Sequence, residues 1–239
     1  SAIDGYWGQR IMKKKPSKRY KKLLELSKTK KVEILEDAIK KIKVNCTTKF
    51  DESIDIYLNL NLKQKKEEFS LRTVVNLPNG NGKKIKVAVL CEEGKIDEAK
   101  NSGADIVGSD TLISDITNGK IDFDRLVATP SMMPKMGKLG KILGPKGLMP
   151  NPKLGTVTPD IKKAVKALKE GQIEIKNDKD GNIGASIGKK SFSDNKIIEN
   201  YKIFIETIMK DKPKGIKGDF ILSSFLTSTM GISYKLKLK

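Results

Sequence analysis

The sequence predicts a mixed fold, α/β plus α+β, in which both ends of the chain form one α+β domain and an α/β domain is inserted between them. Apolar and polar residues alternate near both ends, which is typical of strands with one buried face, whereas residues 85–128 carry continuous short apolar runs, typical of strands buried on both faces. Five turn-forming residues, Pro-Asn-Gly-Asn-Gly at 78–82, separate the two patterns. We therefore place the split domain at residues 1–80 and 172–239 and the inserted domain at residues 81–171.

The N-terminal part of the split domain should contain two helices followed by two strands. Tyr20, Leu23 and Leu24 have helical spacing, and apolar residues repeat that spacing over residues 35–42. Strict alternation over residues 54–62 and again over residues 71–77 predicts two strands, each with one buried and one solvated face.

The inserted domain should contain a small parallel sheet, because its strands alternate with helices. The expected strand, helix, strand, helix and strand occupy residues 85–90, 95–100, 104–107, 110–118 and 126–128. A closing helix should follow, capped by Thr158 with Pro159 in its first turn and ended by Gly171.

The C-terminal part should return to half-solvated strands. Alternation at residues 173–175 and 183–187 around a turn at 177–182 predicts an antiparallel hairpin, with Asp178 and Asp180 as turn formers rather than metal ligands. A long helix is expected after Ser193, followed by strands at residues 220–228 and 234–238.

Two short connections would join the domains, so relative domain movement is expected. Asn79, Gly80 and Gly171 lie at the two boundaries and are the predicted hinge.

The charge of the chain predicts a polyanionic partner. Lys and Arg number 48 and Asp and Glu 29, a net charge of +19. Basic and acidic blocks alternate along the chain: residues 1–31 and 131–153 are basic, and residues 92–124 are acidic. This distribution favours one side turned toward nucleic-acid phosphates and another turned away from them.

Composition also excludes several classes of protein. The chain has no histidine, the commonest general base and metal ligand, which argues against most hydrolase and metalloenzyme chemistry. Cys46 and Cys91 are too far apart for a CxxC motif and are interpreted as reduced, apolar residues. No apolar run approaches the ~18 residues of a membrane span, so no membrane partner is expected.

Residues 137–155 form the most unusual segment, rich in glycine, proline and lysine. Glycine permits close approach of the backbone and proline fixes its path, so this loop is suited to contact phosphate. A purely structural loop explains the composition equally well. Neither the Walker sequence nor the GxGxxG sequence is present, so we expect no nucleotide cofactor, and no cofactor of any other kind.

Two other segments carry candidate binding residues. Lys49, Phe50 and Asp51 precede the first strand, where Phe50 by itself is more simply interpreted as a core residue. Residues 227–231, Thr-Ser-Thr-Met-Gly, combine hydroxyls that suit phosphate or ribose 2′-OH groups with a thioether, although they could equally be an ordinary strand end.

The run Gly-Pro-Lys-Gly-Leu-Met-Pro-Asn-Pro-Lys at 144–153 closely resembles the ribosomal protein L-one family, the protein of the mobile stalk on the large ribosomal subunit, in its bacterial or organellar type. Similarity continues through residues 49–56, 76–83, 103–116, 123–133 and 223–231, and covers nearly all of residues 17–237. The resemblance implies a split domain that binds large-subunit rRNA and an inserted Rossmann-like α/β domain that moves with it. It places the protein on the ribosome, in a bacterial cytoplasm or an organelle interior.

The resemblance also implies which residues bind RNA: Lys49, Phe50, Asp51, Ser53, Lys189, Ser228, Thr229, Met230 and Gly231. The implied partners are large-subunit rRNA, other ribosomal components, deacylated tRNA released at the exit site and, in bacteria, the protein's own mRNA, which it represses. The expected protein is a structural constituent of the ribosome and not an enzyme. Two alternatives stay open on the residues alone: an α/β enzyme, and a free repressor or general nucleic-acid binder.

Overall fold

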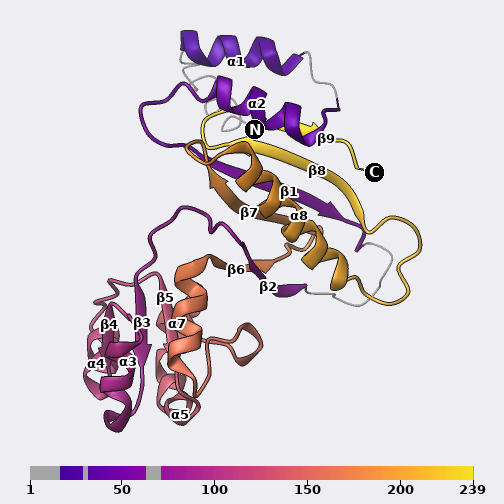
Figure 1. The fold of residues 1–239 in the computed structure, drawn as a ribbon. Coiled ribbons are helices and arrows are strands. Elements are labelled where there is room, and N and C mark those ends of the chain that lie inside the picture. The colour runs from indigo at the N-terminus through magenta and orange to yellow at the C-terminus, as the bar shows by residue number, and fades with distance from the viewer. Residues whose placement is uncertain (1–16, 29–31, 63–70, 239) are drawn as a thin grey trace, which may run out of the picture.

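The structure is a computed structural model that describes residues 17–28, 32–62 and 71–238. Its helices and strands form a mixed α and β architecture with three separate sheets (Figure 1). The largest is a four-stranded antiparallel sheet built from both ends of the chain. Its strands, in spatial order, are β7 (Asn182–Lys189), β1 (Ser53–Leu60), β8 (Ile221–Ser228) and β9 (Tyr234–Leu236).

Helices from both ends of the chain cover one face of this sheet. The predicted alternation is confirmed in β1, where Ile54, Ile56 and Leu58 are buried and Tyr57 on the opposite face is exposed. The buried side chains join one cluster that draws only on residues 38–77 and 173–236. The helices at this end of the structure are α1 (Lys18–Lys28), α2 (Leu35–Asn45) and α8 (Asp194–Lys210), of which α2 and α8 contribute buried residues to the cluster.

The second sheet is parallel, as the sequence predicts. Its order is β4 (Ile106–Gly108), β3 (Val87–Leu90) and β5 (Arg125–Ala128). All four residues of β3 are buried, with Val87 and Val89 in one cluster and Ala88 and Leu90 in another. The sheet is therefore covered on both faces, which explains the continuous apolar run.

The helices around the parallel sheet are mostly short. One cluster packs under α4, α5, η3 and α6, and the other under α3 and α7. These elements are η1 (Glu93–Lys95), α3 (Ile96–Asn101), α4 (Asp110–Thr117), η2 (Pro130–Met132), α5 (Met133–Met136), η3 (Gly137–Leu139), α6 (Gly140–Leu143), η4 (Pro152–Leu154) and α7 (Ile161–Glu170).

The predicted hairpin at residues 173–187 is wrong. The first strand, β6 (Gln172–Lys176), pairs with β2 (Arg72–Asn76), whereas β7 pairs with β1. Asp178 does form the turn, since its carboxylate accepts hydrogen bonds from the backbone N–H of Asp180 and Asn182. After this turn the chain leaves the sheet of β2 and β6 and enters the four-stranded sheet. The Leu60 N–H donates a hydrogen bond to the Gly181 carbonyl, and β7 then runs along β1.

The start of α7 also differs from the prediction. Asp160 is the N-cap, and its side chain accepts a hydrogen bond from the Lys163 N–H at 3.1 Å. Thr158 lies two residues before this N-cap, and its hydroxyl instead accepts a hydrogen bond from the Asp160 N–H. The predicted end at Gly171 is confirmed, with a left-handed φ of 113°.

Candidate nucleic-acid interface

The antiparallel pairing of β1 with β7 and β8 brings all nine predicted RNA-binding residues to one end of the four-stranded sheet. Ser53, the first residue of β1, lies opposite Lys189, the last residue of β7, and Ile54 lies opposite Ser228, the last residue of β8. The loop before β1 and the turn after β8 extend beyond this end. We call this group the sheet-end surface: Lys49, Phe50, Asp51, Ser53, Lys189, Ser228, Thr229, Met230 and Gly231.

Two apolar side chains project from the sheet-end surface. Phe50 is 52% exposed and Met230 is 51% exposed. The interpretation of Phe50 as a core residue is therefore wrong, because the loop before β1 carries its ring outside the buried cluster. An aromatic ring and a thioether in solvent, beside exposed Lys49, are suited to pack on bases or sugars while the cation meets phosphate.

Other members of the surface use their polar atoms within the protein. The Thr229 Oγ1 accepts a hydrogen bond from the Ser53 N–H at 3.0 Å, and the Thr229 N–H donates to the Ser53 carbonyl. Both oxygens of Asp51 are bonded by Ser191, one by its N–H at 3.0 Å and the other by its hydroxyl at 2.7 Å. Thr229 thus fixes the turn that carries Met230, and Asp51 fixes the loop that carries Phe50.

Gly231 approaches Ser228 closely. A Cβ at this position would lie 2.3 Å from the Ser228 hydroxyl oxygen, so a side chain here would require that hydroxyl to move. The Ser228 hydroxyl is buried, and it lies beneath the surface rather than on it.

Glu52, which the sequence analysis did not single out, is fully buried at the centre of the sheet-end surface. Its carboxylate accepts hydrogen bonds from the Thr48 hydroxyl at 2.7 Å and from the Met230 N–H at 3.1 Å. Burial alone would raise the pKa of this carboxyl, but the hydrogen bonds from Thr48 and Met230 outweigh it and lower the pKa below its ordinary value. The only signal in the sequence is its position between two predicted surface residues.

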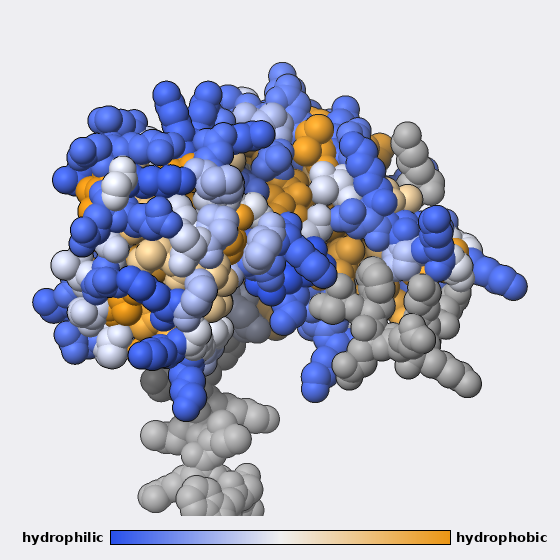
Figure 2. All heavy atoms as spheres, turned by 90° about the horizontal axis from the view of Figure 1, so that it is seen from below, coloured by the Kyte–Doolittle hydropathy of each residue, from blue (hydrophilic) through white to orange (hydrophobic). Residues whose placement is uncertain are grey.

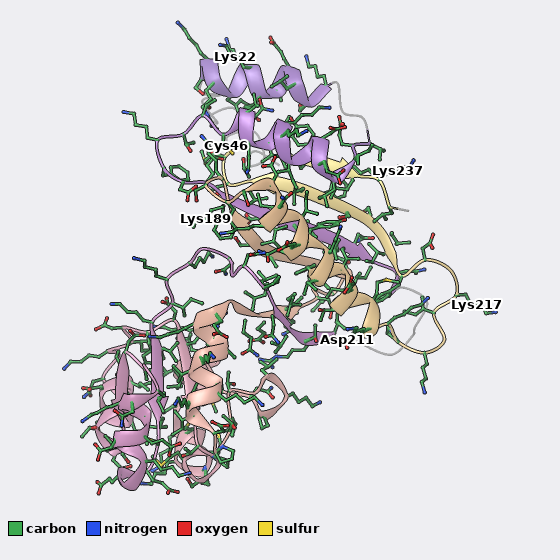
Figure 3. All side chains as sticks on the ribbon, in the orientation of Figure 1. Lys22, Cys46, Lys189, Asp211, Lys217 and Lys237 are labelled. Atoms are coloured by element: carbon green, nitrogen blue, oxygen red, sulfur yellow. The ribbon has the colours of Figure 1, made fainter. Side chains whose placement is uncertain are left out.

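Lys189 connects the sheet-end surface to a neighbouring cleft. The side-chain stem of Lys189 packs against Gly82, and both residues line a cleft with Lys83, Arg125 and Lys146. Asp55 on β1 is half-buried nearby; burial raises its pKa, while Lys83 and Lys189 act in the opposite direction. Basic side chains therefore continue from Lys189 (Figure 3) into this cleft, whose lining also includes Asp124 and Glu174.

The glycine-proline loop at residues 137–155 packs beside the parallel sheet, and Lys146 within it lines the cleft that Lys189 also lines. Leu139, Leu143 and Leu154 are buried, which supports the structural interpretation of this segment. Its lysines are exposed and have no ion-pair partner within the described ranges 17–28, 32–62 and 71–238. Phosphate contact by the loop stays a prediction.

No metal centre accompanies these features in the described part of the chain. No group of His, Cys, Asp and Glu there could hold a metal ion. Cys46 and Cys91 are free and buried, and burial raises the pKa of both thiols. No described helix has the length and apolar character to cross a membrane.

The face in Figure 2 is mainly hydrophilic, with small hydrophobic areas between polar side chains.

Comparison with known proteins identifies relatives over most of the chain. Residues 39–232 match the model of the ribosomal protein L1p/L10e family. The chain is 57% identical to "Large ribosomal subunit protein uL1" of Pelagibacter ubique over 93% of its own length and 98% of the relative. It is 45% identical to "Large ribosomal subunit protein uL1c" of Phaeodactylum tricornutum, covering 94% and 98%, and 48% identical to the uL1 protein of Rickettsia akari, covering 85% of each. This chain belongs to the ribosomal protein L1p/L10e family.

Proposed function

We propose that this protein is a non-enzymatic constituent of the large ribosomal subunit and binds the rRNA of the mobile stalk through the sheet-end surface. The observation that carries the proposal is that two distant segments, residues 49–53 and 228–231, meet at one end of the four-stranded sheet. Each segment exposes one apolar side chain there, Phe50 and Met230. Membership in a family of ribosomal proteins supports the location on the ribosome, whether bacterial or organellar, and sets aside an enzymatic role.

Each part of the surface would contribute differently to binding. Lys49 and Lys189 would neutralise phosphates, and their contribution would weaken as salt rises. Phe50 and Met230 would pack on unstacked bases or on the sugar edge, which recognises shape rather than charge. Ser53, Thr229 and Gly231 would fix the two backbones so that this contact surface is already formed before the RNA arrives.

We also propose that the two sets of buried clusters are two domains, divided at residues 80–81 and 171–172, the second being Rossmann-like. Two observations support this division. The buried clusters draw on separate parts of the chain, and the two connections between them lie side by side. Asn79, Gly80 and Gly171 would be the hinge. Asn200, fully buried on α8, accepts a hydrogen bond from the Asn79 N–H and donates one to the Gly80 carbonyl, so bending at this hinge would have to strain these two bonds.

Two finer roles belong to this proposal. Movement of the inserted domain with the stalk would assist release of deacylated tRNA from the exit site. The protein's own mRNA, if it folds like the rRNA site, would compete for the sheet-end surface and be repressed. Excess stalk rRNA should then displace that mRNA from the protein, whereas a control duplex of the same length should not.

The first test is binding to the stalk rRNA fragment and to a same-length control duplex across a salt series. We expect a preference for the stalk fragment that persists at high salt, because shape recognition does not depend on counterion release. Phe50→Ala and Met230→Ala should each reduce that preference about tenfold, the scale of one lost base-stacking contact. Met209→Ala is the matched control, since Met209 is 45% exposed at the far end of α8.

Equal affinities that fall together as salt rises would contradict the proposal. In that case the net charge of +19 alone would explain binding, and the assignment of the sheet-end surface would be withdrawn.

A further inference from the structure

Arg19 on α1 reaches the sheet-end surface from the opposite end of the sequence. Its Nη2 donates a hydrogen bond to the Met230 carbonyl at 2.8 Å, and its Nε donates to the Thr47 hydroxyl at 2.8 Å. One guanidinium group therefore bonds both chain segments that flank the surface. The planar group can do this because its donors diverge in a fixed fork, which the single ammonium of a lysine does not offer.

Glu52 bonds the same turn from the other side. Its carboxylate accepts from the Met230 N–H, and its Oε1 lies 3.9 Å from the Arg19 Nη2. Both backbone polar groups of Met230 are thus bonded by charged side chains from elsewhere in the chain, the N–H by Glu52 and the carbonyl by Arg19. The Glu52 side chain is fully buried and that of Arg19 is 33% exposed, so the pair lies mainly beneath the surface.

The rest of α1 makes little buried contact. Leu23 is its one buried residue, and Tyr20, Leu24 and Leu26 are all at least 45% exposed. Lys22, one helical turn after Arg19, is exposed on the same helix, and its side chain makes no hydrogen bond or ion pair with the described residues (Figure 3). The contacts of Arg19 are therefore specific to that residue and not a general property of a basic helix.

We infer that Arg19 and Glu52 are positioning residues that hold the turn at residues 229–231 in its RNA-binding conformation. The inference rests on the proposed function, because it concerns how the sheet-end surface is prepared for RNA. Arg19 fixes the Met230 carbonyl and Glu52 fixes the N–H, so the Met230 side chain is presented outward before RNA binds. Preorganisation of this kind raises affinity by removing the cost of ordering the turn during binding.

The test compares Arg19→Lys, Arg19→Ala and Lys22→Ala for binding to the stalk rRNA fragment and to the control duplex across salt. Arg19→Lys keeps the charge but loses the fork, so it should lose stalk affinity about tenfold, the scale of a lost charged hydrogen bond. Its dependence of log affinity on log salt should match the wild type, since no phosphate contact is removed. Lys22→Ala should weaken both RNAs equally or leave both unchanged.

Two outcomes would overturn the inference. If Arg19→Lys binds like the wild type and Arg19→Ala reduces the salt slope by about one, Arg19 is a direct phosphate contact. If both variants bind like the wild type, the turn does not need Arg19. Glu52→Gln tests the second partner and should lose stalk affinity without a change in salt slope.

The wild-type protein separates this inference from the proposed function. A wild type that prefers the stalk fragment, together with variants that keep this preference, rejects the positioning role alone. A wild type without the preference rejects the proposed function itself.

Discussion

The residues of the sheet-end surface, together with Glu52 buried beneath it, include a group that faces solvent and a group that bonds other parts of the protein. Phe50 and Met230 are half-exposed and available to a partner, whereas Asp51, Thr229 and Glu52 bond other parts of the protein. Substitutions in the first group should therefore change RNA binding with little effect on stability. Substitutions in the second group should change stability as well, because each leaves a hydrogen-bonding group without its partner.

Thr229→Val tests the second group. The substitution removes the Oγ1 that accepts from the Ser53 N–H, so we expect the free energy of unfolding to fall by about 1 kcal/mol. Thr229→Ser keeps the hydroxyl and should lose less. Urea unfolding at fixed pH measures both, and equal losses for Val and Ser would show that the hydrogen bond contributes nothing.

Glu52 should make stability depend on pH in the acidic range. Its pKa is lowered in the folded state, despite burial, by hydrogen bonds from Thr48 and Met230. The stabilisation is therefore present above the unfolded-state pKa of about 4.3 and is lost as pH falls through the lower folded-state value. Wild-type stability should fall more steeply below about pH 4 than that of Glu52→Gln, measured by denaturant unfolding at several pH values; parallel curves would contradict this.

The sequence could place the sheet-end residues but not describe their contacts. The resemblance named residues 49–53 and 228–231, and in the structure these two segments lie side by side. It could not reveal that Thr229 bonds Ser53 or that Glu52 lies beneath Met230, since these contacts join residues more than 170 positions apart. Arg19 was hidden among many basic residues because its special role comes from one guanidinium position, not from composition.

At the scale of elements, local patterns predicted which segments form strands, whereas pairing was decided by distant partners. The alternation in β6 and β7 is real, with Ile173, Ile175, Ile183 and Ile187 all buried. The same pattern suits a hairpin or two separate sheets equally well. The outcome depends on β2 and β1, which lie beside the two strands and satisfy their backbone groups, and sequence spacing does not report this.

The two chain connections between the proposed domains lie against each other at Gly171, and we expect that only glycine fits this position. Gly171 has φ of 113°, and a Cβ there would lie 2.4 Å from the Cα of Gly80. Gly171→Ala should therefore lower the free energy of unfolding by more than about 1 kcal/mol, because strain and backbone overlap act together. Gly119→Ala is the control, since its φ is also positive but no atom lies within 4 Å of its Cβ position. Similar losses in both variants would show that overlap between the two connections adds nothing.

At the scale of the whole molecule, the net charge and the sheet-end surface should affect RNA binding in different ways. The charge of +19 should strengthen binding to any nucleic acid at low salt, whichever surface it contacts. Basic α1 lies at the opposite end of the ribbon from the acidic region around α3 and α4 (Figure 1), so the field is uneven. Selectivity that survives high salt must come instead from a defined surface, and the sheet-end surface lies entirely on residues outside 81–171.

Removal of residues 82–170, with a short glycine linker in their place, tests the proposed division of the molecule. Gly80 and Gly171 pack directly against each other, so the linker spans no new distance, and the large cluster draws no residue from the removed segment. We expect the shortened chain to unfold cooperatively and to keep the high-salt preference for stalk rRNA. Loss of cooperative unfolding would mean that the cores depend on each other and are not two domains. A folded chain without the preference would mean that residues 82–170, including the cleft lysines beside Lys189, take part in recognition.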